Sequence, residues 1–414
     1  SISLPLKKKW FFMFHIELIG VSGDSLSKEQ RQLIDSCVLI AHSRRQEGML
    51  AGLGLAKVSI TPLNALYEAL ETGLKKGNVA VLASGDPLFF GIGKNLLAHF
   101  GPDCLQIYPA LSAIQLACAR FKTPWEDLSI LSLHGRQPTN LAARILQHER
   151  VLCFTDAQNS PNTIAQVLKD ILTAYGDTER LQGVRLQVGE NLGLSSEKLS
   201  VGSPDEIAGK TFSPLNMVLV EQPTLPRANL PVFGLSEQEI AHSRGLITKD
   251  EIRAATLHHL RLPSEGVFWD IGGGSGSVSL EAARLAPKLD IYTIEKKTEE
   301  QENIRHNVRT FAAYSINLIS GEAPEALVAL PAPDRIFIGG SGKRLVEILH
   351  IAANRLRPDG LIVVNAVLES TRDTALTTLK KLGLQVHLTT LALTREVPDQ
   401  APQHYNLITI LTAT

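Results

Sequence analysis

The chain has 414 residues, more than one hydrophobic core usually organises, so two domains of about 200 residues each are expected. Hydrophobic residues make up 44% and charged residues 20%, which excludes a disordered or fibrous chain. Lysine and arginine total 41 against 42 aspartates and glutamates, and this balance disfavours a protein that holds nucleic acid through excess basic charge.

Cysteine usage and hydropathy indicate the cellular compartment in which the protein is expected. Its four cysteines form no C-x-x-C pair, which predicts a reducing compartment and no zinc or other metal site. No run of about 18 apolar residues is present, so no membrane association is expected and a cytoplasmic location is predicted. Residues 1–13, which contain three lysines before a short apolar run, are excluded from fold reasoning, and whether residues 1–12 are native stays open.

Residues 14–222 alternate short β-branched runs with helical stretches, the first helix being expected at Lys28–Cys37. This alternation predicts an α/β domain with a largely parallel sheet. The expected strands are Phe14–Val21, Asn78–Ala83, Gln106–Pro109, Leu128–Leu133, Val151–Thr155, Val184–Val188 and Leu215–Glu221.

Residues 223–232 contain three prolines without periodicity and are expected to form a stiff linker. A second α/β pattern fills residues 233–414, and the two halves show no internal repeat. Its expected strands are Val267–Ile271, Ile291–Glu295, Ile316–Ile319, Arg335–Ile338, Leu361–Val364, Leu384–Leu388 and Tyr405–Leu411.

The strand Val267–Ile271 leads into a glycine-rich turn, and Ser277–Leu285 then has the pattern of a helix. A strand, a glycine turn and a helix form a crevice in which backbone approaches a ligand closely. A dinucleotide site requires G-x-G-x-x-G, but Ser277 stands at its sixth position and the pattern here is D-x-G-x-G-x-G. Glu295 ends the next expected strand, where a carboxylate can accept hydrogen bonds from both ribose hydroxyls.

Thr248 and Glu251 fit an S/T-x-x-E capping box for a helix from Lys249 to His259. Capping does not exclude a second role, because a hydroxyl at a helix N-terminus can also face a ligand carboxylate.

The glycine turn and the placed glutamate resemble class I S-adenosylmethionine (SAM) methyltransferases. Read with GLITKDEIR, GEAPEAL and DRIFIGGSG, the half from Phe233 onward resembles the decarboxylating corrin-ring C15-methyltransferases of cobalamin biosynthesis. The family usually has Gly-Asp-Ala-Pro where this chain has Glu322, which puts a side-chain contact to the adenine amine in doubt. The SAM contacts that the resemblance implies are Thr248, Gly272, Gly273, Gly274, Ser275, Gly276, Glu295 and Ala323.

In the first half, ASGDPLFFG follows a buried-type strand, and YPALSAIQLA, SLHGR and FSPLNMVLVE follow in order. This set resembles the tetrapyrrole methylases, specifically the corrin C5-methyltransferases, which bind SAM between two α/β lobes. The resemblance implies cofactor contacts at Gly85, Asp86 and the turn Pro109–Ser112. Ser22 departs from the glycine that the family often has in a loop bordering the substrate cleft, so substrate fit is less secure than cofactor binding.

Basic residues beside these loops are candidates to bind substrate carboxylates, since a corrin precursor carries many of them and arginine binds carboxylates in bidentate fashion. Solvated surface charge is the alternative for each of them. The candidates are Arg136, Arg244, Lys249, Lys343 and Arg344. Arg344→Ala is expected to weaken substrate binding and leave SAM affinity unchanged.

The expected fold class is α/β: a tetrapyrrole-methylase-type two-lobed domain followed by a class I Rossmann-like methyltransferase domain. The fused arrangement resembles the precorrin-6B (precorrin-6Y) C5,C15-methyltransferases, decarboxylating. The resemblance implies two methyl transfers from SAM to a tetrapyrrole, loss of the C12 acetate carboxyl, no metal cofactor and a homo-oligomer, with no catalytic residue assigned.

Four alternatives stay open: a cobalt-containing substrate, one half acting only as a binding module, an NAD(P)-dependent oxidoreductase, and a SAM enzyme acting on RNA or protein. The neutral charge disfavours the last of these.

Overall fold

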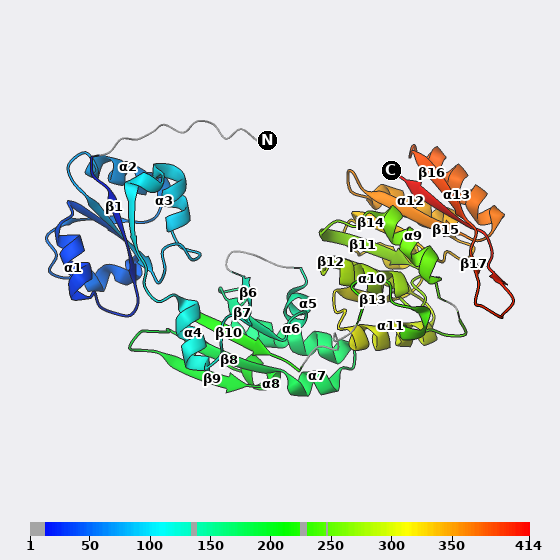
Figure 1. The fold of residues 1–414 in the computed structure, drawn as a ribbon, viewed down its shortest axis with the longest axis horizontal. Coiled ribbons are helices and arrows are strands. Elements are labelled where there is room, and N and C mark those ends of the chain that lie inside the picture. The colour runs from blue at the N-terminus through cyan, green and yellow to red at the C-terminus, as the bar shows by residue number, and fades with distance from the viewer. Residues whose placement is uncertain (1–12, 134–138, 224–229, 246) are drawn as a thin grey trace.

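The computed structural model describes residues 13–133, 139–223, 230–245 and 247–414. Within these ranges the chain forms two lobes and a C-terminal domain, with the second lobe lying between the other two parts (Figure 1). Each part is organised around one principal β-sheet.

The sheet of the first lobe has the strand order β3-β2-β4-β1-β5, and all its pairs are parallel. Its strand β1, which lies between β4 and β5, is buried at every position, as a parallel strand covered on both faces requires. The strands are β1 Ile16–Val21, β2 Leu39–His42, β3 Ala56–Ser59, β4 Val79–Ser84 and β5 Leu105–Tyr108. The helices are α1 Lys28–Asp35, the 3₁₀ helix η1 Arg44–Leu50, α2 Leu63–Gly73, α3 Gly93–Phe100 and the 3₁₀ helix η2 Pro102–Cys104.

The sheet of the second lobe has the order β6-β7-β10-β8-β9. Only β6 and β7 pair in parallel, so the prediction of a largely parallel sheet is wrong for this lobe. The strands are β6 Ser129–Ser132, β7 Arg150–Phe154, β8 Arg185–Glu190, β9 Lys198–Gly202 and β10 Asn216–Glu221. The helices are α4 Ala113–Phe121, α5 Leu141–Leu146, α6 Pro161–Ala174, α7 Thr178–Gly183 and α8 Pro204–Ala208.

The C-terminal domain contains a seven-stranded sheet of order β13-β12-β11-β14-β15-β19-β16, in which β19 runs antiparallel to both neighbours. Its strands are β11 Glu265–Ile271, β12 Lys288–Glu295, β13 Ile316–Ser320, β14 Arg335–Ile338, β15 Leu361–Ala366, β16 Val386–Leu391 and β19 Ile408–Ala413, and β17 Thr394–Arg395 pairs with β18 Gln403–His404. The helices are η3 Glu237–Glu239, α9 Asp250–Leu260, α10 Ser277–Leu285, α11 Thr298–Phe311, η4 Glu325–Leu327, α12 Leu345–Arg355 and α13 Glu369–Lys381.

All fourteen strands expected from the sequence are present, with ends shifted by up to three residues, and α10 has the predicted bounds. The sequence did not predict β2, β3, β9, β17 and β18. The strands β17 and β18 have two residues each, and β3 and β9 are mostly exposed, so these four lack the apolar run that marks a buried strand. The strand β2 does lie in an apolar run, residues 38–41, but this run follows directly on the expected helix Lys28–Cys37.

The second lobe and the C-terminal domain share one hydrophobic core, which includes Leu168 and Leu172 of α6 together with Val308 and Phe311 of α11. The clusters of the first lobe contain no residue beyond Tyr108.

Polar contacts join the same two parts. The buried Asp290 of β12 accepts hydrogen bonds from Thr139 and Asn140, and Tyr314 donates to Asp177. The guanidinium of Arg309 donates to the carbonyl oxygen of Tyr175 at 2.6 Å. Burial of polar and apolar groups alike therefore fixes the second lobe to the C-terminal domain.

Candidate functional sites

The C-terminal site lies where β11 ends and the glycine turn leads into α10. Gly272, Gly274 and Gly276 have φ values of 71°, 54° and 74°, a region that residues with a Cβ rarely adopt. At Gly272 an added Cβ would lie 2.2 Å from the carbonyl oxygen of Gly340, whereas at Gly274 it would meet nothing within 4 Å. The first glycine therefore permits close packing of two loops, and the second leaves backbone open towards the cavity.

Glu295 ends β12 beside this turn and is 7% exposed. One carboxylate oxygen accepts the backbone N–H of Gly274 at 2.9 Å, and the other accepts that of Lys297 at 2.8 Å. These bonds hold the carboxylate at the cavity wall, and each oxygen keeps a lone pair for a further donor.

The cavity at this edge of the sheet contains four of the predicted SAM-contact residues: Gly272, Gly274, Glu295 and Ala323. Gly273, Ser275 and Gly276 belong to the same turn but do not line the cavity. The carbonyl oxygen of Ser275, for example, accepts a hydrogen bond from Asn307 at 3.0 Å. Other lining residues are Ile271, Ile294, Lys296, Lys297, Glu300, Gly321, Glu322, Gly340, Ser341, Gly342 and Ile348.

Thr248 is not among the residues that line this cavity. The predicted capping box is wrong, because α9 begins at Asp250, its N-cap residue is Lys249, and no side chain caps it. Glu251, the acidic member of that motif, binds Arg395 at 2.7 Å instead. The carbonyl oxygen of Thr248 accepts from Arg253 at 3.2 Å.

Asp270, the aspartate before the glycine turn, is 1% exposed, and burial raises its pKa to about 6. Ser279 donates to one carboxylate oxygen at 2.6 Å, and the other oxygen is buried without a hydrogen-bond partner among the described residues. Sequence analysis used Asp270 only as part of the glycine motif. Its position between a strand end and a loop was the signal that could have marked it.

The basic candidates have different environments. Arg344 donates to both carboxylate oxygens of Glu325, at 2.6 and 2.7 Å, and to Glu347 at 2.6 Å. Lys343 and Arg244 are exposed and make no hydrogen bond or ion pair with any other described residue. Lys249 is paired with Glu237 at 2.6 Å, and Arg136 lies outside the described residues.

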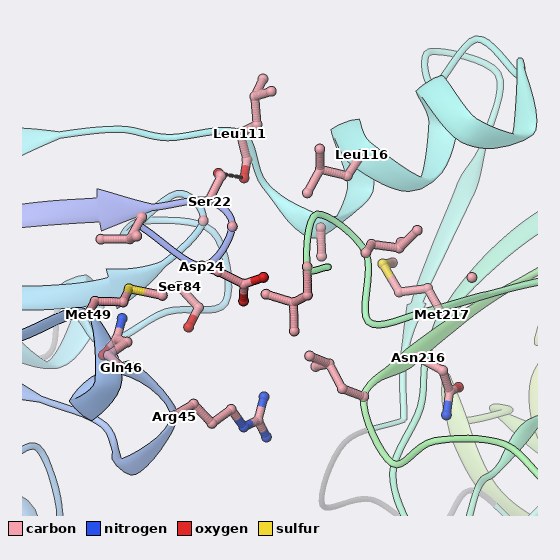
Figure 2. A pocket seen from close by; sticks show the side chains of 18 residues that line it. Ser22, Asp24, Arg45, Gln46, Met49, Ser84, Leu111, Leu116, Asn216 and Met217 are labelled. Carbon is pink, nitrogen blue, oxygen red and sulfur yellow. Dashed lines mark hydrogen bonds between the residues drawn. The ribbon is translucent and has the colours of Figure 1, made fainter. Parts of the chain in front are cut away.

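A second cavity lies between the two lobes of the N-terminal half (Figure 2). Loops that follow β1, β2, β4 and β5 meet there because the carboxyl ends of parallel strands share one edge of a sheet. The second lobe closes the opposite side. The lining residues are Val21, Ser22, Gly23, Asp24, Arg45, Gln46, Met49, Ser84, Gly85, Leu111, Ala113, Leu116, Gly189, Leu192, Leu194, Leu215, Asn216 and Met217.

Gly85 lines this cavity with φ of 66°, and its N–H donates to the carbonyl oxygen of Val21 at 2.8 Å. An added Cβ would lie 3.1 Å from the Cα of Ser112, so the turn Pro109–Ser112 packs directly against this loop. Asp86 does not line the cavity. Its carboxylate accepts the N–H of Leu88 at 2.8 Å and stabilises the turn.

Ser22, the departure noted from the family pattern, joins two of these loops by donating to the carbonyl oxygen of Leu111 at 2.7 Å. The neighbouring Asp24 joins the lobes, because its carboxylate accepts the N–H of Ser195 at 2.7 Å. Sequence analysis missed the second-lobe contribution from Asn216 and the pair Arg45 and Gln46, which follows the unpredicted strand β2.

Comparison with known proteins separates the same two halves. Residues 20–208 match the tetrapyrrole (corrin/porphyrin) methylases, and residues 239–400 match the precorrin methyltransferase domain. The precorrin-6Y C(5,15)-methyltransferase [decarboxylating] of Sinorhizobium sp is 32% identical over 362 residues, covering 86% of this chain and 84% of the relative. The chain belongs to the precorrin-6Y C5,15-methyltransferase family. This membership confirms the methyltransferase class, the family and the fold class expected from the sequence.

Each half also resembles a shorter protein. The cobalt-precorrin-7 C(5)-methyltransferase of Salmonella typhimurium is 33% identical over 169 residues, covering 41% of this chain and 79% of that protein. The probable cobalt-precorrin-6B C(15)-methyltransferase (decarboxylating) of Sulfolobus acidocaldarius is 36% identical over 160 residues, covering 38% of this chain and 83% of that protein. A crystal structure of precorrin-6y C5,15-methyltransferase from Geobacter metallireducens is 40% identical over 44% of this chain and 98% of its own, with a TM-score of 0.43.

No described helix is long and apolar enough to cross a membrane. No cluster of three or more histidine, cysteine, aspartate or glutamate side chains with metal-binding geometry occurs in the part of the chain that the structure describes.

Proposed function

We propose that this protein methylates C5 and C15 of precorrin-6B with two SAM-derived methyl groups and removes the C12 acetate carboxyl as carbon dioxide, giving precorrin-8. The observation that carries the proposal is the presence of one cavity at the carboxyl ends of parallel strands in each half. The C-terminal cavity lies within residues 239–400, which match the precorrin methyltransferase domain, and the N-terminal cavity is lined by residues within the tetrapyrrole methylase match, 20–208, together with Leu215, Asn216 and Met217. The residue boundaries that we propose are 14–222 for the C5 domain, 223–232 for the linker and 233–414 for the C15 and decarboxylating domain.

In the C-terminal cavity the residues present fit SAM. The carboxylate of Glu295 is held at the wall with acceptor capacity for ribose hydroxyls, and the open side of Gly274 permits close approach of a ligand. Ala323 lines the same cavity and offers backbone groups to the base. Glu322 is engaged by Lys296 at 2.7 Å, so we assign it no contact to the adenine amine.

In the N-terminal cavity we assign the cofactor to the side formed by Gly85 and Leu111. The positive φ of Gly85 turns the chain so that two loops meet at a distance which leaves no room for a side chain. Asp86 acts by holding this loop, and Ser22 acts by joining it to the turn at Leu111. SAM, when bound, supplies an electrophilic methyl group.

Methyl transfer to an electron-rich ring carbon is an in-line displacement, so the chain's main contributions are positioning and exclusion of water. We assign no catalytic acid or base. Lys343 and Arg244 are exposed and unpaired in the described part of the chain, which makes them our first choices for substrate carboxylates near the C-terminal site, ahead of Arg344. Arg136 stays a candidate by its position in the sequence.

The experiment is product mass spectrometry with methyl-labelled SAM, offering metal-free precorrin-6B and its cobalt form in parallel. Gain of two labelled methyls with loss of one carbon dioxide supports the proposal, and the preferred substrate distinguishes the two routes. One methyl gained with decarboxylation would mean that the N-terminal half is a binding module, and no change with either substrate would overturn the proposal.

Matched variants assign each methyl to its half. Gly272→Ala alters the C-terminal turn, where no Cβ fits, and Gly85→Val alters the N-terminal loop. The order of the two methylations is open, so the variant altered in the half that acts second is expected to lose one labelled methyl and retain the other. Loss of both methyls by both variants would contradict the assignment of one methyl to each cavity.

A further inference from the structure

Two adjacent residues of η1 line the inter-lobe cavity, and neither has a part in the contacts described above. Gln46 is 3% exposed, and its amide oxygen accepts hydrogen bonds from the backbone N–H and the hydroxyl of Ser43, both at 2.9 Å. Its amide nitrogen is buried and has no hydrogen-bond partner among the described residues. Because Ser43 fixes the oxygen, the NH₂ group is fixed as well.

A buried amide donor without an acceptor is unfavourable, and such groups in folded proteins generally have a partner. Gln46 lines the cavity, so a ligand oxygen there would supply the acceptor. The side chain is already held in position, and binding would therefore cost little rotamer entropy.

Arg45 adds a positive charge at the same place. Its side chain is exposed, lines the cavity and makes no hydrogen bond or ion pair with any other described residue. Asp24, the acidic residue of the lining, accepts the N–H of Ser195 and does not pair with Arg45. Figure 2 shows Arg45 extending from η1 into the space between the lobes, on the opposite side of the cavity from Leu111.

We propose that Arg45 and Gln46 form a carboxylate-binding pair that takes a peripheral carboxylate of the tetrapyrrole substrate and orients the ring for C5 methylation. A guanidinium beside a fixed amide donor provides a charge-assisted site for a carboxylate. The cofactor also carries a carboxylate, but we assign the cofactor to the side of Gly85 and Leu111, and Figure 2 shows Leu111 across the cavity from Arg45. This inference rests on the proposed function.

The test uses the full-length protein and compares three variants with the unmodified chain. Arg45→Met removes the charge and keeps the length of the side chain, and Gln46→Glu keeps an oxygen for Ser43 while replacing the amide donor with a negative charge. Arg44→Met is the matched control, because Arg44 is the adjacent exposed arginine of η1 and does not line the cavity. Initial rates with labelled SAM give KM for C5 methylation and for C15 methylation, and calorimetry gives the affinity for S-adenosylhomocysteine.

We expect KM for the C5 step to rise about 10- to 100-fold in Arg45→Met and in Gln46→Glu, and less than about 2-fold in Arg44→Met. KM for the C15 step and the affinity for S-adenosylhomocysteine should stay unchanged. If Gln46→Glu does not fold, Arg45→Met decides the result alone, since its exposed side chain supports no described contact.

An unchanged KM for the C5 step in Arg45→Met would overturn the proposal. A parallel loss of S-adenosylhomocysteine affinity would also overturn it and assign the pair to the carboxylate of the cofactor. Failure of the proposed function is distinguishable, because the unmodified chain would then transfer no methyl to C5 at all.

Discussion

The two cavities differ in how the chain forms them. Among the described residues, those that line the C-terminal cavity fall within residues 271–348, and most of them lie at the ends of neighbouring strands of one sheet, so local backbone geometry determines most of its shape. The N-terminal cavity is lined by residues from Val21 to Met217, which belong to two lobes with separate sheets. The first site therefore depends on a few glycines, and the second depends on how two bodies are held relative to each other.

The hydrophobic core that the second lobe shares with the C-terminal domain adds a second difference between the two halves. Apolar residues of α6 pack with those of α11 across the two halves, whereas the clusters of the first lobe stay within that lobe. The second lobe is therefore a wall of the N-terminal cavity and at the same time a structural neighbour of the C-terminal domain. A substitution among the C-terminal residues that pack on the second lobe can therefore alter the N-terminal cavity. A substitution in the glycine turn of the same domain should not.

The largest expected effect comes from Gly272→Ala, which tests the local character of the C-terminal site. The new Cβ would lie 2.2 Å from a backbone oxygen of Gly340, at a φ of 71° that also disfavours alanine. We expect kcat/KM for C15 methylation to fall at least about 100-fold while C5 methylation stays within about 2-fold. Product mass spectrometry with labelled SAM measures both steps in one assay.

Gly274→Ala is the control for this prediction. Its Cβ would meet no atom within 4 Å, so only the cost of the left-handed backbone and any clash with the ligand remain. We expect a loss of C15 methylation within about 10-fold. Equal losses in the two variants would show that crowding against Gly340 is not the cause.

Removing a contact between the second lobe and the C-terminal domain tests the shared core. Asp290→Ala deletes the buried acceptor for Thr139 and Asn140, and we expect it to lower the free energy of unfolding by about 2 kcal/mol. Thermal denaturation followed by circular dichroism measures this loss. An unchanged melting temperature would indicate that the second lobe does not depend on this contact.

The third prediction concerns pH and the buried carboxyl of the C-terminal site. Burial raises the pKa of Asp270 to about 6 from an ordinary value of 3.8, so between about pH 4 and 6 the native state holds a proton that the unfolded state has released. The contribution of Asp270 to stability is therefore fully present below pH 4 and is lost as the pH rises through 6, by about 3 kcal/mol in total.

Asp270→Asn removes this titration and keeps a side chain of the same shape. The stability of the variant relative to the unmodified chain should rise between pH 4 and 6 and stay level above pH 6. Urea denaturation at a series of pH values measures the difference. A difference that does not change with pH would contradict the raised pKa.

The contrast between the cavities also explains what the sequence could predict. The turn from Gly272 to Gly276 and the helix Ser277–Leu285 follow from glycine spacing and apolar periodicity within about 20 residues, and the structure confirms that helix. Pairing direction is not contained in such patterns, so the antiparallel strands of the second lobe were missed. Arg45 was not predicted because it follows β2, a strand of four residues whose apolar run comes directly after the expected helix Lys28–Cys37. Thr248 and Glu251 match the capping motif, but Glu251 binds Arg395, 144 residues away, and no side chain caps α9.

The smallest expected effect separates Lys343 and Arg344, two neighbouring cations that follow Gly342, a lining residue of the C-terminal cavity. The sequence made both Lys343 and Arg344 candidates and led to the expectation that Arg344→Ala weakens substrate binding. In the structure, however, the guanidinium of Arg344 donates hydrogen bonds to Glu325 and Glu347, which raise its pKa and occupy it, whereas Lys343 has no partner among the described residues. A carboxylate of the substrate would have to displace two acidic side chains to bind Arg344, and only water to bind Lys343.

We therefore expect Lys343→Ala to raise KM for C15 methylation about 3- to 10-fold and Arg344→Ala less than about 2-fold, with unchanged S-adenosylhomocysteine affinity in both. Steady-state kinetics at low ionic strength gives the most sensitive comparison, since salt screens exposed charges. A larger effect of Arg344→Ala would mean that its carboxylate partners release the guanidinium when substrate arrives, and the rim of this site would then share the dependence on rearrangement that distinguishes the N-terminal cavity.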